Sequence, residues 1–385
     1  FALLFGLAGR YLGMPPLVGF LCAGFVINAF AGTIGIPAST GKYLSHLAHL
    51  GVLILLFGVG LKLKFRQVLK PEVVGGGILQ FALSSVLFVP VFALVLGLDW
   101  ETALLVSMCL GFSSTVLAAK LLETKKELAL FHGRTSIGIL VIQDLIALAI
   151  LAIWSDQTPN LGALSLLALP LLRPLLHKVV DLVGHGELLV LTSMLLAVVV
   201  GGGGFTAMGL SSELGALVVG AMLANHPRAI EISSSLLSLK ELFLVCFFLS
   251  IGMSGLPSME SLTVALLASV LMPLKMVVFF GVLVAFKLRA RSAFLSAISL
   301  ASYSEFGLIV AAAVMPEWLV PLAITMSCSF VIAAPLNRYA HTLFERYEPF
   351  LNRWQRNTYH PDEQTTDLGR ADALIFGMGR MGSAA

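Results

Sequence analysis

The sequence predicts an all-α membrane protein with about thirteen transmembrane helices. Hydrophobic residues make up 58% of the chain and charged residues only 12%, against roughly a quarter charged in an ordinary soluble domain. Apolar runs of about the length that crosses a bilayer recur along the whole chain. Basic residues gather in alternate connections between these runs, as in polytopic proteins whose orientation follows the positive-inside rule.

The expected membrane segments follow from reading apolar runs against polar interruptions. Their ranges are 1–9, 16–31, 47–61, 73–97, 101–121, 135–154, 160–173, 187–210, 213–225, 240–256, 261–286, 293–315 and 317–337. Two of them, 160–173 and 213–225, are shorter than the twenty or so residues that a full crossing needs. Each of these two is therefore expected to tilt, re-enter or stop short.

The placement of basic residues predicts the orientation. When the connections alternate between two sides, sixteen lysines and arginines fall on one side: Arg10, Lys62, Lys64, Arg66, Lys70, Lys120, Lys125, Lys126, Arg134, Arg173, Lys178, Arg228, Lys240, Lys287, Arg289 and Arg291. Lys42 alone falls on the opposite side. By the positive-inside rule the sixteen residues are cytoplasmic, and the C-terminal tail lies on the same side.

Asp144 is the main candidate for ion binding. It follows Gln143 inside the apolar segment 135–154. Placing an acidic side chain at mid-bilayer costs upwards of roughly 2.5 kcal/mol, so such a residue normally faces a packed bundle or a wet cavity and marks an ion or proton path. The alternative is a structural hydrogen bond between helices.

Lys275 and Glu305 are the other ionisable residues that lie well away from the segment ends. One base and two acids can be buried together at lower cost than separately. Lys275 is therefore expected to pair with one of the two carboxylates, Asp144 or Glu305.

Two segments contain polar or glycine interruptions, CLGFSSTV at 109–116 and LASYSEFG at 300–307. Interrupted helices in corresponding positions of two halves are typical of transporters built from inverted repeats, in which unwound backbone meets the bound ion. Ser113, Ser114 and Thr115 are expected to supply neutral oxygens beside Asp144, because hard cations bind several oxygen ligands. Alternatively, these hydroxyls satisfy the backbone of a kinked helix.

Several short motifs follow one another along the sequence: GMPPLVGFLCAG at 13–24, LLFGVGL at 55–61, FSST at 112–115, QD at 143–144, ELGALVVGAMLA at 213–224, FFLSIGM at 247–253 and SEF at 304–306. This is the order seen in the monovalent cation:proton antiporter-2 superfamily, which the chain resembles over essentially its whole length. The Gln143–Asp144 pair is most similar to that of the Kef-type glutathione-gated potassium efflux systems. Residues 303–306 read YSEF, where the superfamily commonly has GGEF.

The resemblance implies a potassium/proton antiporter of the bacterial inner membrane that works by alternating access. The cation and the proton would compete for Asp144, with Gln143 beside it. The fold it implies has inverted repeats and two broken crossing helices, with one bundle for the ion and a second bundle that forms a homodimer. Membrane lipid is an expected partner, a cytoplasmic regulatory subunit is a further one, and no nucleic acid is expected.

Three domains are expected: a transmembrane antiporter domain at 1–337, a cytoplasmic linker at 338–370 and the start of an α/β domain at 371–385. A strand-like run at 371–376 precedes Gly377, Gly379 and Gly382, the spacing with which a Rossmann-type unit approaches a pyrophosphate. By resemblance this is a nucleotide-binding RCK or KTN domain. The resemblance places a nucleotide (AMP or NAD(H)) and glutathione in that domain, of which the sequence contains only the start.

Other functions remain as alternatives. A sodium/proton antiporter of the same superfamily would use the same residues. A ligand-gated potassium channel would need a carbonyl filter such as TVGYG, which the sequence lacks, and a nucleotide-dependent enzyme would need a catalytic constellation. Because Gln143 cannot titrate, one cation is expected to exchange for one proton if Lys275 and Glu305 form a fixed pair.

Overall fold

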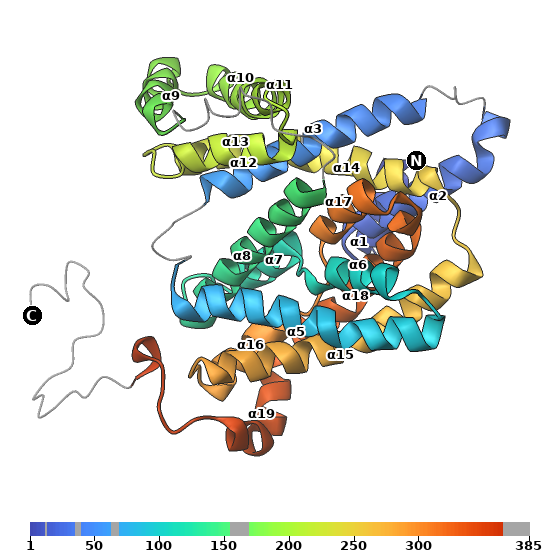
Figure 1. The fold of residues 1–385 in the computed structure, drawn as a ribbon, viewed down its shortest axis with the longest axis vertical. Helices are drawn as coiled ribbons and strands as arrows, with labels where there is room; N and C mark the ends of the chain where they lie inside the picture. Colours follow the sequence, from blue (N-terminus) through green and yellow to red (C-terminus); the bar gives the residue numbers. More distant parts are fainter. Residues whose placement is uncertain (12–13, 35–39, 63–68, 155–168, 365–385) are drawn as a thin grey trace, which may run out of the picture.

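The computed structural model describes residues 1–11, 14–34, 40–62, 69–154 and 169–364. Every regular element among these residues is a helix, which confirms the all-α class (Figure 1). Seven of the helices are long and apolar enough to cross a membrane, and four shorter ones are apolar as well. A multi-pass membrane protein is therefore shown, whereas thirteen crossings stay a prediction. The predicted α/β start at 371–385 lies outside the described residues.

The helices form two groups. The first group contains α1 (Ala2–Tyr11), α2 (Pro16–Ile34), α3 (Thr40–Leu61), α9 (Leu169–Val183), α10 (Glu187–Met194), the π-helix η2 (Leu195–Gly203), α11 (Gly204–Ala207), α12 (Ser212–Leu223), α13 (Ala229–Ser235) and α14 (Leu237–Ser254). Within it, α3 packs against α12 and α14, and α2 packs against α14. Gly24 and Gly252 allow the last contact, because a Cβ on Gly24 would lie 2.8 Å from the Cα of Gly252.

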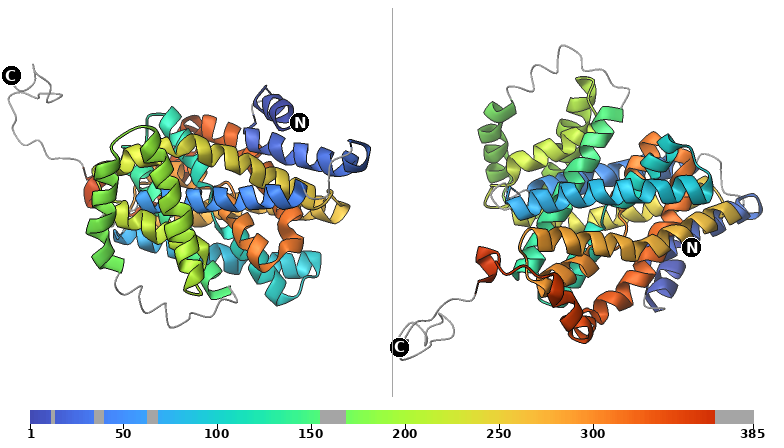
Figure 2. Two further views of the ribbon diagram at one scale, coloured as in Figure 1. Left: turned by 90° about the horizontal axis from the view of Figure 1, so that it is seen from above. Right: turned by 60° about the horizontal axis from the view of Figure 1, so that its bottom comes forward.

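The second group contains α5 (Pro71–Leu96), α6 (Trp100–Gly111), α7 (Thr115–Thr124), α8 (Phe131–Trp154), α15 (Met259–Ala285), α16 (Ala290–Ser299), α17 (Glu305–Val314), the short 3-10 helix η3 (Pro316–Trp318) and α18 (Leu319–Arg338). In it, α5 packs against α6 and α8, and α15 packs against α16 and α18. The right-hand view of Figure 2 shows α9 and α10, in green, on the far side of the molecule from α16 and α19.

Two predicted boundaries differ from the structure by more than four residues. The segment expected at 47–61 belongs to a helix that begins at Thr40, because Lys42 and His46 lie in its first turns instead of in a loop. The segment expected at 160–173 lies outside the described residues up to 168, and α9 then runs on to Val183. Arg173 and Lys178 were assigned to a connection, but they lie within this amphipathic helix.

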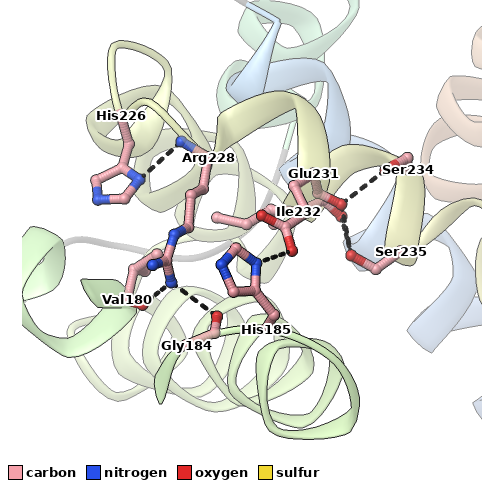
Figure 3. Close-up of polar contacts among 9 residues, drawn as sticks. All are labelled: Val180, Gly184, His185, His226, Arg228, Glu231, Ile232, Ser234 and Ser235. Carbon is pink, nitrogen blue, oxygen red and sulfur yellow. Dashed lines mark hydrogen bonds and ion pairs between the residues drawn. The ribbon is translucent and has the colours of Figure 1, made fainter. Parts of the chain in front are cut away.

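Polar contacts join the C-terminal end of α9 to α13 (Figure 3). The guanidinium of Arg228 donates hydrogen bonds to the carbonyls of Val180 (3.3 Å) and Gly184 (2.8 Å). The imidazole of His185 lies 2.6 Å from the Glu231 carboxylate. We refer to this region as the α9–α13 junction.

Residues 340–364 fold back on the ends of α5, α8 and α16, and we call them the C-terminal strap. The strap begins with α19 (Ala340–Leu351) and includes the 3-10 helices η4 (Asn352–Trp354) and η5 (Pro361–Glu363). Lys70 donates to Asp362 at 2.9 Å, and the backbone N–H of Arg289 donates to Glu363 at 2.6 Å. These contacts join the strap to the N-terminal ends of α5 and α16, which both belong to the second group.

The strap also contacts the turn between α7 and α8. His341 lies 2.7 Å from Glu127, and His132 lies 3.2 Å from the other oxygen of the same carboxylate. Burial raises the pKa of Glu127, but its hydrogen bonds with His341 and His132 outweigh burial and hold this pKa below its ordinary value. Glu127 is therefore ionised at neutral pH and can hold His341 of the strap as a hydrogen-bond acceptor.

Candidate ion-binding site

The two predicted interruptions are present and lie side by side. Helix α6 ends at Gly111 and α7 begins at Thr115, while α16 ends at Ser299 and α17 begins at Glu305. Between them, Ser113 and Tyr303 form an isolated antiparallel bridge, and the N–H of Ser114 donates to the Ser302 carbonyl at 3.3 Å. We refer to residues 111–115 and 299–305 together as the break.

The close approach of the broken helices depends on a glycine. A Cβ on Gly307 would lie 2.2 Å from the carbonyl oxygen of Cys109, so any other residue would push α17 away from α6. The break is thus held in the interior of the second group, and four helix ends meet there.

Both candidate carboxylates reach the break. Asp144, on α8, is 2% exposed, and both of its oxygens lie 3.4 Å from the Thr115 hydroxyl. Glu305 is the first residue of α17, and its Oε2 accepts a hydrogen bond from the Ser114 hydroxyl at 3.1 Å. The structure therefore brings Ser114 and Thr115 close to Asp144, as the sequence suggested, and also places Glu305 beside Ser114.

Lys275 has partners other than those expected. Its ammonium donates to the carbonyl oxygens of Leu110 (3.2 Å) and Phe112 (2.6 Å), and it lies 4.9 Å from the ring centre of Tyr303. The last carbonyls of a helix have no partner within the helix, and a cation is favoured at that end by the helix dipole. Lys275 thus caps α6 where it ends in the interior instead of neutralising a carboxylate.

Gln143 is not free to act as a simple ion ligand. Its Oε1 accepts a hydrogen bond from the N–H of Ser113 at 2.9 Å, and its Nε2 donates to Oε1 of Gln80 at 2.6 Å. Gln80, on α5, is fully buried and was not among the residues that the sequence suggested. The available signal was its position as a lone amide within a long apolar helix.

Three buried oxygens at the break lack a hydrogen-bond partner among the described residues: Glu305 Oε1, Ser113 Oγ and Ser302 Oγ. An unpaired buried polar group costs about 1–3 kcal/mol, so three of them at the break need an explanation. Carboxylate, hydroxyl and carbonyl oxygens are the ligands that hard cations bind. The chemistry of this set fits a hard cation.

Two interrupted helices that meet beside a buried carboxylate define a secondary transporter for cations. The chain belongs to the sodium/hydrogen exchanger transmembrane family, which matches residues 1–336. YbaL of Escherichia coli (strain K12), a candidate cation/proton antiporter, is 29% identical over 418 residues, which cover 99% of this chain and 74% of YbaL.

The glutathione-regulated potassium-efflux system protein KefC of Enterobacter sp. (strain 638) is 28% identical over 402 residues. This match covers 96% of the chain but 62% of KefC, so the chain spans less than two thirds of that relative. Together with YbaL and the family match, it confirms the Kef-type resemblance and supports cation/proton antiport.

A solved structure, the sodium proton antiporter MjNhaP1 from Methanocaldococcus jannaschii at pH 8, shares the fold. The TM-score is 0.62 at 16% identity, and the match covers 89% of this chain and 94% of that one. This similarity shows the arrangement of helices and leaves the transported ion open.

Proposed function

We propose that the chain exchanges potassium for protons across the bacterial inner membrane, with the cation and the proton competing for Asp144. The observation that carries the proposal is a buried carboxylate beside a break that presents the Thr115 hydroxyl to it. A proton on Asp144 removes the charge that the cation needs, so each ion displaces the other. Alternating access then requires only that the two loaded forms differ in their preferred conformation.

We assign the residues of the site different roles in binding the cation. Asp144 supplies the charge, and Ser113, Ser114 and Thr115 supply neutral oxygens. Oε2 of Glu305 accepts a hydrogen bond from the Ser114 hydroxyl. The oxygen of that hydroxyl in turn accepts from the N–H of Leu117 at 3.3 Å. A negative charge is also favoured at the first residue of α17 by the helix dipole. We therefore assign the exchange to Asp144 and expect Glu305 to keep one protonation state through the transport cycle.

This assignment implies one cation for one proton. Gln143 is an amide with both ends hydrogen-bonded, so it neither titrates nor carries charge. Lys275 is bonded to carbonyls and needs no proton from the transport cycle. Exchange is then electroneutral and independent of the membrane potential.

Regulation and assembly extend the proposal. The strap connects the end of the second group to the residues that follow 364, and KefC is named for glutathione regulation and is longer than the chain. We propose a linker at 338–370 and a cytoplasmic nucleotide-binding domain that starts at 371, with Gly377, Gly379 and Gly382 at the pyrophosphate. Those glycines lie outside the described residues. We further propose a homodimer formed through the first group of helices.

The test is transport in proteoliposomes with defined potassium, sodium and proton gradients. We expect potassium-driven proton flux, a weaker response to sodium, and no sustained current on a solid-supported membrane. A sustained current that disappears in Asp144→Asn would overturn the one-for-one scheme and make Glu305 or Lys275 a second proton carrier. Faster exchange with sodium than with potassium would instead establish the sodium/proton antiporter, and flux without counter-transported protons would indicate a channel.

A further inference from the structure

Gln80 belongs to a buried chain of hydrogen bonds that ends at the break. It lies on α5, and its Nε2 donates to the Ser84 hydroxyl one turn along the same helix at 2.9 Å. Its Oε1 accepts from Nε2 of Gln143, on α8, at 2.6 Å. Gln80 and Ser84 are 0% exposed and Gln143 is 1% exposed, so water cannot readily replace any of these bonds.

The backbone fixes the donor-to-acceptor direction of these hydrogen bonds at one end of the series. The N–H of Ser113 can only donate, so the atom of Gln143 that faces it must be the carbonyl oxygen. The amide nitrogen of Gln143 must then face Gln80, and Gln80 must present its own oxygen. One backbone donor thus determines the orientation of two side-chain amides.

The peptide bond between Phe112 and Ser113 is consequently held on both sides. Its N–H donates to Gln143, and its carbonyl accepts from Lys275 at 2.6 Å. The next N–H, of Ser114, donates to Ser302 on the other broken segment. The 112–113 peptide lies between the end of α6 and the start of α7, so these contacts help to determine where the hydroxyls that follow it point.

We propose that Gln80 is a positioning residue for the ion site: by fixing the amide of Gln143 it clamps the 112–113 peptide, and so places the hydroxyls of residues 113–115 for the cation. This inference rests on the proposed cation/proton exchange. Gln80 touches neither Asp144 nor the cation. Its role is expressed in cation affinity, because the hydroxyls serve the cation, whereas the proton needs only the carboxylate of Asp144.

The test compares Gln80→Met, Gln80→Glu and Ser85→Ala by exchange kinetics in proteoliposomes. Methionine matches glutamine in size but leaves Gln143 without an acceptor, so the KM for potassium should rise about threefold to tenfold, the effect of one lost buried hydrogen bond. Glutamate supplies an acceptor oxygen in either protonation state and should restore KM to within about twofold of the wild type. Ser85 lies beside Ser84, but its hydroxyl donates to the Phe81 carbonyl and takes no part in the hydrogen bonds that link Gln80 to the break. Ser85→Ala is therefore the matched control.

A merely structural role gives a different pattern. It would lower the fraction of active protein, and hence the maximal rate, while KM and the pH profile stay as in Ser85→Ala. That result in a folded Gln80→Met protein overturns the inference. If Gln80→Met does not fold, Gln80→Asn replaces it, since its amide is one methylene too short for Gln143; a wild-type KM in Gln80→Asn likewise overturns the inference. Absence of exchange in the wild type would instead refute the proposed function.

Discussion

Lys275 and Arg228 perform the same task in two regions of the molecule. Each donates to the carbonyls at the C-terminal end of a helix: Lys275 at the end of α6 in the break, and Arg228 at the end of α9 in the α9–α13 junction (Figure 3). Lys275 is 0% exposed, whereas Arg228 is only half-buried. The chemistry of the contact is shared, and the surroundings differ.

The difference separates an ion site from a structural contact. At the α9–α13 junction the His185 imidazole and the Glu231 carboxylate contact each other and reach solvent, with side chains 69% and 37% exposed. In the break, by contrast, three buried oxygens have no partner in the described part of the chain. A network in which every polar group has a hydrogen-bond partner stabilises the fold, whereas a network that contains oxygens without partners can bind a cation. The following predictions test this distinction.

The largest effect is expected from Asp144→Asn, with Asp181→Asn as the control. Asparagine keeps the shape but neither releases a proton nor balances a cation, so exchange should fall to that of empty vesicles. Asp181 lies 3.2 Å from His226 at the α9–α13 junction, with its side chain 65% exposed, and its replacement should leave exchange intact. Folding of both variants is checked by thermal unfolding in detergent. Robust exchange in folded Asp144→Asn would show that another residue binds the cation and the proton, with Glu305 as the next candidate.

The second prediction compares Lys275→Met with Arg228→Met. Loss of Lys275 leaves two buried carbonyls unpaired, so the free energy of unfolding should fall by about 2 kcal/mol or more, and exchange should slow as the break loosens. Arg228 is half-buried, and water can replace its bond to the partly exposed Gly184, so the cost of losing it should stay below about 1 kcal/mol and exchange should be unchanged. Equal losses in the two variants would remove the distinction between the regions.

The sequence predicted those features of the break that depend on residue type alone. A carboxylate or a Ser-Ser-Thr run inside an apolar segment is conspicuous, and the structure places both at the break. The partners of Lys275 could not be predicted, because they are backbone carbonyls and every residue has one. Gln80 was visible as an amide in an apolar helix, but its contact with Gln143 depends on how α5 and α8 are rotated about their axes, which tertiary packing determines.

A moderate effect is expected from Thr115→Ala and Ser114→Ala. Each removes one neutral oxygen from the set around the carboxylates, so the KM for potassium should rise about threefold to tenfold. The pH at which protons inhibit should shift less, since Asp144 keeps its own oxygens. Thr206→Ala is a suitable control, because Thr206 donates to the Gly202 carbonyl in the first group of helices. If both variants keep the wild-type KM, these hydroxyls serve only to satisfy the kinked backbone.

The smallest effect is expected from Glu231→Gln. The Glu231 carboxylate contacts His185 at 2.6 Å, while Ser234 and Ser235 bond to the Glu231 backbone carbonyl and are untouched by the substitution. A contact between two exposed side chains contributes at most about 1 kcal/mol even where both are charged, so the melting temperature should hardly change. Any remaining difference from the wild type should vanish in 1 M salt, where screening acts within about 3 Å. Exchange kinetics should match the wild type, and a threefold or larger change in KM would show that the α9–α13 junction takes part in transport.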